Sequence, residues 1–187
     1  MIDIHELLES LKLAFESKNI RVTDCLLPPL SMRQIIEDCE WYPDTLPDEI
    51  IQLYTWSGGQ DPYGENLFIF RDVNLLSLGQ AKIEYEIMIQ TRAAEGFVNG
   101  INLKYCFPFA AADGSRYLLP SERHGLLRNM SRPVLQAFHD ESEYFSSFRS
   151  MLRTCIEWVG HPKYDESPLW GMIEHEIWIR NNPDIIF

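Results

Sequence analysis

The order of the hydrophobic patterns along the 187 residues constrains the fold more than any other feature. Apolar residues recur every three or four positions near both ends, whereas the middle holds short apolar runs separated by turn residues. Helices, then mostly adjacent strands, then helices are typical of an α+β domain and not of alternating βαβ units. We therefore predict a single domain over 1–187, in which N-terminal and C-terminal helices pack a twisted, antiparallel-rich sheet.

Capping signals and apolar spacing place three helices in the first half of the chain. A helix over about 3–18 follows Asp3, whose carboxylate can form a capping box with Glu6. A short helix follows Ser31 and is expected to end near Trp41. A longer helix is predicted from about residue 78 to 94, after the Ser-x-x-Gln signal at its start.

The stretch LPDEIIQLYTWSGG, at 46–59, predicts one more helix and its end. Pro47 suits the first helical position, where its missing N–H is no loss. Gly58 is expected to take the left-handed conformation that closes a helix, and Gly59 to let the chain turn sharply. Because these glycines follow the helix, the stretch does not predict a phosphate-binding loop, whose glycines precede a helix N-terminus.

The middle of the chain predicts strands. Apolar runs at 105–110 and 117–119 flank Asp113-Gly114, a dipeptide that favours a tight hairpin turn. Two further short strands are expected within 125–138.

Two helices are expected at the C-terminal end. The segment 141–160 places Tyr144 and Phe145 with its later apolar residues on one broad helical stripe. A last helix, from 167 to about 181, is expected to bury Met172 and its apolar neighbours.

Charge narrows the classes of partner. The chain has 28 acidic and 16 basic residues, a formal net charge of -12, which disfavours unaided binding to nucleic acid or to anionic membranes. The segment between Arg33 and Arg71 contains no base and eight acids: Glu37, Asp38, Glu40, Asp44, Asp48, Glu49, Asp61 and Glu65. A basic protein partner fits this distribution, and so does a simple role in solubility.

Signals for catalysis or metal binding are weak. His175-Glu176 begins a zinc-protease-like string, but Ile179 stands where the second histidine is required. The four cysteines match no metal-ligand spacing and are expected to be reduced and mostly buried, as in a cytoplasmic protein. No run of eighteen apolar residues is present and the N-terminal segment begins with acids, so neither a membrane span nor secretion is expected. We expect no enzymatic activity, no cofactor and no metal.

Several motifs in order resemble the SUKH superfamily, which includes fungal cell-wall assembly regulators and bacterial relatives. The resemblance covers about 31–155, leaving the N-terminal helix 3–18 and a C-terminal helical extension over 157–187 outside it. It rests on a Leu-Pro helix opening with a Gly-Gly turn and on a Pro-containing strand with an Asp-Gly hairpin, here Leu46, Pro47, Gly58, Gly59, Pro108, Asp113 and Gly114. Ser57 departs from the family, which often has asparagine before the glycines.

The resemblance implies a non-catalytic protein-binding module, and many bacterial members are immunity proteins that neutralise toxins, often nucleases. Together with the acidic charge it predicts an immunity protein that occludes the active site of a basic, nuclease-type toxin in the cytoplasm. An intracellular regulator or scaffold that binds housekeeping partners, as in cell-wall assembly regulators, is the alternative.

Aromatic and acidic residues around the 46–59 helix are the candidate partner-binding residues: Trp56, Asp61, Tyr63, Glu65, Asp44 and Asp48. Trp56 and Tyr63 also fit a role in covering the edge of the sheet. Trp170 and Trp178 are a second candidate surface, explained equally well by core packing or by a homodimer contact. Whether the chain is a monomer or a homodimer stays open.

Overall fold

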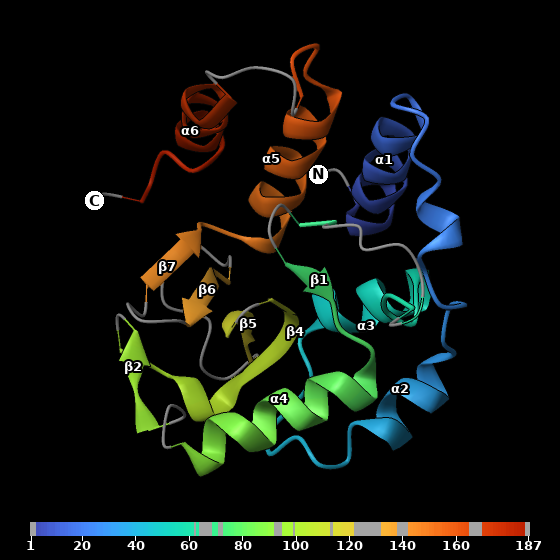
Figure 1. Cartoon of the computed structure of the whole chain (residues 1–187). Coiled ribbons are helices and arrows are strands. Elements are labelled where there is room, and N and C mark those ends of the chain that lie inside the picture. The colour runs from blue at the N-terminus through green and yellow to red at the C-terminus, as the bar shows by residue number, and fades with distance from the viewer. Residues whose placement is uncertain are drawn as a thin grey trace.

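The computed structural model describes residues 3–61, 63, 69–70, 73–91, 95–98, 100–112, 114–121, 132–137, 142–164 and 170–185. The helices and strands in chain order are α1 (Ile4–Glu16), α2 (Met32–Asp38), α3 (Asp48–Trp56), β1 (Asn74–Leu75), α4 (Leu78–Gln90), β2 (Phe97–Val98), β3 (Ile101–Asn102), β4 (Cys106–Ala112), β5 (Ser115–Pro120), β6 (Val134–Ala137), β7 (Ser142–Phe145), α5 (Phe148–Gly160) and α6 (Trp170–Asn181). Short 3-10 turns lie at Val22–Asp24 and Leu103–Tyr105. Figure 1 shows their arrangement.

Five strands form one antiparallel sheet in the order β1-β4-β5-β6-β7, and β2 and β3 form a separate small hairpin. The β4–β5 hairpin was predicted from Asp113-Gly114. Gly114 has φ +84°, and Asp113 lies outside the described residues. The α+β class with an antiparallel sheet is thus confirmed.

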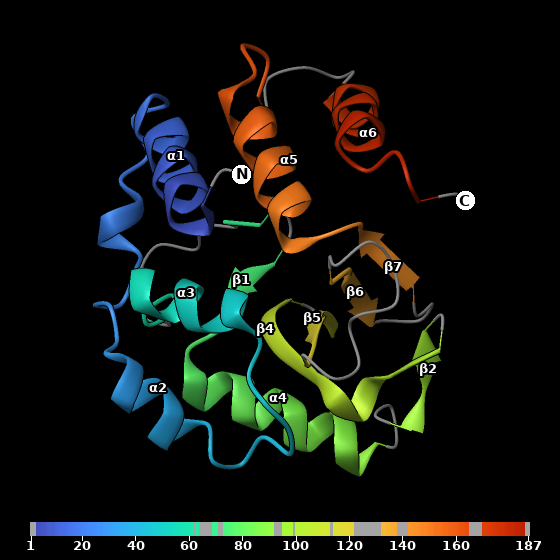
Figure 2. The ribbon, with the colours of Figure 1, turned by 180° about the vertical axis from the view of Figure 1, so that it is seen from behind.

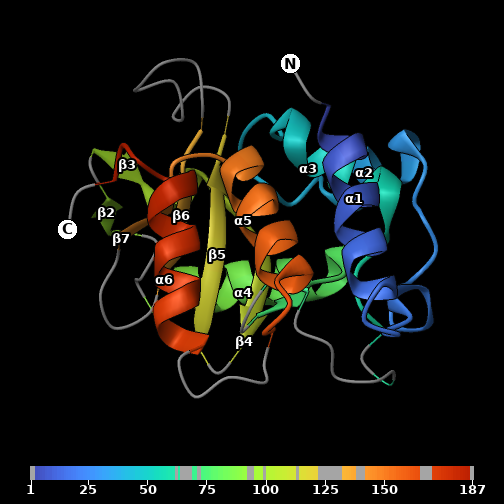
Figure 3. The ribbon, with the colours of Figure 1, turned by 90° about the horizontal axis from the view of Figure 1, so that it is seen from above.

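Helices cover the sheet from two sides. α5 contacts both α1 and α6, and Figure 3 shows α5 between these two helices. α4 packs against β4 and runs along the opposite border of the molecule, beside α2, as Figures 1 and 2 show from both directions. The predicted packing of the sheet by terminal helices is therefore correct, and α4 adds a layer built from the middle of the chain.

The capping signals are the most accurate part of the sequence prediction. Asp3, Ser31 and Ser77 each begin a helix with a reciprocal capping box. The predicted apolar face of α1 is at most 5% exposed and consists of Ile4, Leu7, Leu8, Leu11 and Phe15. These side chains join one large core that also takes in residues from α3, α5 and the sheet.

The predicted helical stripe over 141–160 is wrong in its first part. Residues Ser142–Phe145 form β7, which pairs with β6, and α5 begins only at Phe148. The start of α5 is set locally, because the backbone of Ser147 is extended and its side chain accepts a hydrogen bond from the Ser150 N–H. The strand itself depends on its pairing with β6. Apolar spacing alone could not separate the strand from the helix that follows it.

Several boundaries also differ from the prediction. α2 ends at Asp38, three residues before Trp41, and α4 ends at Gln90, four residues before Ala94. Pro47 is the N-cap of α3 and not its first helical residue. In the segment 125–138 the described residues contain one strand, β6, and residues 125–131 and 138 lie outside them.

The last helix lies as predicted at its C-terminal end, but its packing differs. Residues 167–169, where its start was predicted, lie outside the described residues. Met172 was expected to be buried and is 63% exposed, whereas Ile177 and Trp178 are each 4% exposed. The face of α6 that packs against α5 and β7 is therefore formed by Ile177 and Trp178.

Candidate functional site

α3 positions most of the predicted partner-binding residues. Ile50, Leu53 and Tyr54 are fully buried, as predicted, and the Tyr54 hydroxyl donates to the carbonyl oxygen of Leu76 at 2.9 Å. These contacts fix the helix against the sheet. With a rise of about 1.5 Å per residue, Asp48 and Trp56 lie about 12 Å apart along the axis of α3. The candidate residues therefore fall into two groups, one at each end of the helix.

The double-glycine turn after α3 is held by backbone contacts, and its two glycines differ from their predicted roles. Ser57 is extended, and it is Gly59, not Gly58, that has a positive φ, of +112°. A Cβ on Gly58 would lie 2.7 Å from the carbonyl oxygen of Pro28, and one on Gly59 would lie 2.6 Å from the backbone of Ser77. Gly58 is required by a close approach, and Gly59 by both conformation and space.

The side chain of Trp56 packs inside the protein. Its side chain is 7% exposed, and its indole Nε1 donates to Oε1 of Glu9 at 2.7 Å. The tryptophan thus joins α3 to α1 and does not present an aromatic surface to a partner. The sequence signal for an exposed aromatic anchor at this position was misleading because the position of α1 is a property of the tertiary fold.

Tyr63 and Asp61 lie beyond the turn. Tyr63 is 96% exposed, and its backbone N–H donates to Oδ1 of Asp61 at 2.9 Å. Asp61 in turn is held by its own N–H, which donates to the carbonyl oxygen of Cys25 at 2.9 Å. Glu65 lies outside the described residues. Of the aromatic candidates, Tyr63 is the one that faces solvent.

Asp44 and Asp48 lie at the other end of α3. Asp44 accepts hydrogen bonds from the Thr45 N–H at 2.7 Å and from the Ser121 hydroxyl at 2.8 Å. Asp44 thereby connects the start of α3 to the end of β5. Asp48 is exposed and makes no ion pair with a described residue.

Folding neutralises part of the acidic stretch that the sequence shows without bases. Glu49 accepts from the guanidinium of Arg132 at 2.5 Å and 3.1 Å, and both side chains are less than 20% exposed. Glu37 pairs with Arg33 on the surface of α2 at 2.7 Å. The pairing of Glu49 was not visible in the sequence because Arg132 is 83 positions away.

Three acids of the stretch remain exposed and form no ion pair with any described residue: Asp38, Glu40 and Asp48. We call them the α2–α3 carboxylates. Met32 and Ile36 on α2 are 56% and 54% exposed, so apolar side chains accompany the charges on this helix. Sequence reasoning used these two residues only to place a helix and missed their exposure.

Two thiols of the core, Cys39 and Cys106, have raised pKa values. All four cysteines are buried, as predicted. Burial, with a smaller effect of Asp38, raises the pKa of Cys39 to about 12, and burial also raises that of Cys106. Both thiols stay protonated near neutral pH. Within the same residues, no group of three or more His, Cys, Asp or Glu could hold a metal ion.

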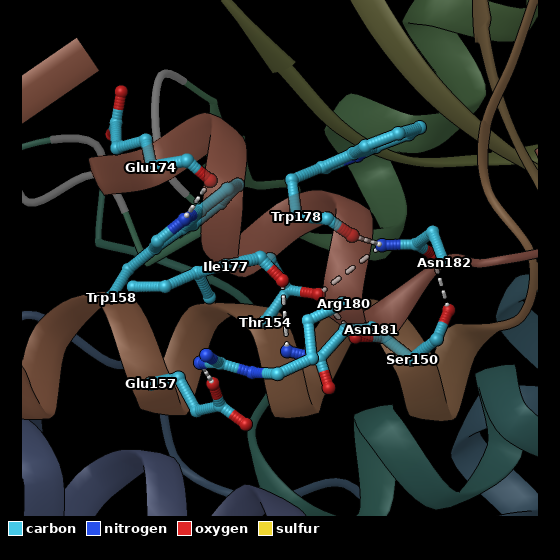
Figure 4. A network of polar contacts seen from close by, with 10 residues as sticks. All are labelled: Ser150, Thr154, Glu157, Trp158, Glu174, Ile177, Trp178, Arg180, Asn181 and Asn182. Carbon is cyan, nitrogen blue, oxygen red and sulfur yellow. Dashed lines mark hydrogen bonds and ion pairs between the residues drawn. The ribbon is translucent and has the colours of Figure 1, made fainter. Parts of the chain in front are cut away.

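The second candidate surface, on α6, is mostly interior. The Trp178 indole donates to the carbonyl oxygen of Tyr144 in β7 at 2.9 Å, and the Trp158 indole of α5 donates to that of Glu174 at 3.0 Å. Figure 4 shows the polar network between the two helices. The side chain of Trp170 lies outside the described residues. Trp178 therefore serves core packing, one of its two predicted roles.

No helix in the described part of the chain combines the length and the apolar character needed to cross a membrane. In comparisons with known proteins, no family model matches this chain and no curated protein matches it.

Proposed function

We propose that this chain is a non-catalytic protein-binding module that acts inside the cell as an immunity protein. Its partner would be a basic, nuclease-type toxin whose active site it occludes. The observation that carries the proposal is the presence of the three α2–α3 carboxylates, exposed and without ion pairs to described residues, on a chain of net charge -12. Resemblance of the 46–59 and 105–119 motifs to the SUKH superfamily supports the same function.

A nuclease presents cationic side chains to the phosphates of its substrate, so exposed carboxylates can occupy the same positions. The negative field of the whole chain would also steer a basic partner and raise the association rate by about 10–1,000-fold at low ionic strength. Asp38, Glu40 and Asp48 can supply such contacts because no described base competes for them. Met32 and Ile36 add apolar area, which supplies affinity where charges supply orientation.

The experiment is co-expression with toxin domains, beginning with any encoded beside this chain, scored by cell survival and by a purified complex. Neither protection nor a complex with any candidate would refute the proposal. Protection without inhibition of nuclease activity in vitro would refute the occlusion mechanism.

Charge reversal then locates the surface. The triple variant Asp38→Lys, Glu40→Lys, Asp48→Lys should slow association with the toxin at least about tenfold at low salt. The triple variant Glu16→Lys, Asp24→Lys, Glu176→Lys is the matched control, because it changes the net charge equally at other exposed positions. Equal slowing in both would show that only the total charge matters.

The turn beyond α3 is tested separately. If it contributes to the interface, Asp61→Lys combined with Glu65→Lys weakens binding without lowering the melting temperature. An unchanged dissociation constant would remove this turn, and with it the predicted role of Tyr63.

A further inference from the structure

α4 has an apolar outer face. The helix buries Leu78, Ala81, Tyr85 and Met88 against the sheet and its neighbours, yet Ile83 is 57% exposed and Ile87 is 37% exposed. Positions four apart on a helix lie on the same side, so these two isoleucines form one short row. The row lies on the opposite side of the helix from the buried residues. In Figures 1 and 2 α4 lies at the border of the molecule, where the coil between α2 and α3 passes alongside it.

The charged residues that flank this row are balanced. Lys82 and Glu86 form an i,i+4 ion pair at 4.0 Å on one flank, and each is about half exposed. On the other flank Glu84 accepts from Nε of Arg116 at 2.7 Å. The row therefore differs from the surface of α2, where exposed acids lack bases, and it has no feature that selects a basic partner.

Two copies of this surface complement each other. When two α4 helices pack antiparallel about a two-fold axis, the isoleucine rows face each other. The same operation puts the Lys82–Glu86 flank of each copy on the same side and in reverse order. Lys82 of one copy then lies opposite Glu86 of the other, in both directions, which is the self-complementarity that a two-fold interface requires.

We propose that α4 is a homodimer interface in which Ile83 and Ile87 pack against their copies and Lys82 pairs with Glu86 across the two-fold axis. The contact is independent of the proposed immunity function. Because it centres on four isoleucines and two intermolecular ion pairs, the contact is small and self-association is weak.

The test is the mass of the purified full chain by sedimentation equilibrium from low micromolar to sub-millimolar concentration. A concentration-dependent doubling of mass is expected, and a monomer throughout this range would overturn the proposal. Ile83→Glu should weaken self-association at least about 100-fold, because it places a charge at the centre of an apolar contact. Its circular dichroism spectrum should be unchanged, because Ile83 is already 57% exposed.

Leu13→Glu is the matched control, since Leu13 is 62% exposed on α1. It should leave the dimer intact. A dimer that persists in Ile83→Glu, or that is lost equally in Leu13→Glu, would overturn the assignment to α4.

Charge reversal tests the register. Lys82→Glu and Glu86→Lys should each weaken the dimer several-fold, and the double variant should restore it, because reversal of both signs recreates the pairing in each copy. Failure of the double variant to recover affinity would refute the antiparallel arrangement.

Discussion

Asn182 holds the C-terminal helix to the rest of the protein, and its replacement should lower the free energy of unfolding. The residue is 1% exposed and follows the last residue of α6. Its side-chain oxygen accepts from the Ser146 N–H at 3.0 Å and from the Ser150 hydroxyl at 2.8 Å. Its amide nitrogen donates to the carbonyl oxygen of Trp178 at 2.9 Å and to the Thr154 hydroxyl at 3.4 Å. One side chain thus joins α6 to α5 and to the segment after β7.

Asn182→Ala removes these bonds and leaves buried groups without partners. Loss of the two shortest bonds, with the Ser150 hydroxyl and the Trp178 carbonyl oxygen, costs about 1 kcal/mol each. The Ser146 N–H, left without its acceptor, adds about 1 kcal/mol or more. We therefore expect a loss of about 3 kcal/mol in the free energy of unfolding, equivalent to about 6–12 °C in melting temperature for a domain of this size.

Urea denaturation followed by circular dichroism measures the free energy of unfolding. Tryptophan fluorescence reports on the docking of α6 directly. The indole of Trp158 donates a hydrogen bond from α5 to α6, and the indole of Trp178 donates one from α6 to β7. Asn181→Ala is the control, since the side-chain hydrogen bond of Asn181, from Nδ2 to the Ile177 carbonyl oxygen, lies within the helix. A loss below about 0.5 kcal/mol in Asn182→Ala, or an equal loss in both variants, would refute the reasoning.

Three other perturbations test the glycine turn, the buried ion pair and the buried thiols. Gly59→Ala should destabilise by about 2–3 kcal/mol, because its φ is +112° and its Cβ would meet backbone at 2.6 Å. Gly79→Ala, whose Cβ would meet no atom within 4 Å, should instead be neutral or mildly stabilising, so equal melting temperatures would contradict this account. Glu49→Gln should cost about 1–3 kcal/mol in urea denaturation by leaving Arg132 without its anion, and an unchanged midpoint would show that this pair contributes nothing. The pKa of Cys39 is raised from 9.0 to about 12 in the folded protein, so as pH rises the thiol ionises in the unfolded chain first. The free energy of unfolding therefore falls by about 1.4 kcal/mol for each pH unit above pH 9. Cys39→Ala should show a shallower decline in denaturant midpoint between about pH 9 and pH 11, and an identical slope would argue against burial of this thiol.

The sequence predicted the elements whose signals are local. The capping boxes at Asp3, Ser31 and Ser77 and the buried stripe of α1 are all present, because a cap and its helix depend on residues within a few positions of each other. The strand at 142–145 was missed because its structure does not depend on nearby residues alone. Its apolar residues fit a helix continued from α5, and only the pairing with β6 makes it a strand.

The candidate site depended more on tertiary contacts. Asp48 and Tyr63 are exposed, as a partner surface requires, whereas Trp56 is buried against α1 and Glu49 is paired with Arg132. The contact of Trp56 with Glu9 and the pairing of Glu49 with Arg132 each join residues that are tens of positions apart. Composition and periodicity carry no information about which distant residues meet.

What the sequence by itself determined is the α+β order of the elements, the starts of α1, α2 and α4 and the excess of negative charge, because these follow from neighbouring residues and from a sum over the chain. The tertiary structure alone decided which acids keep a free carboxylate and which apolar residues stay outside the core. Charge neutralisation and burial are pairwise properties of a folded surface, and they exist only after α1, α5 and the sheet have been brought together.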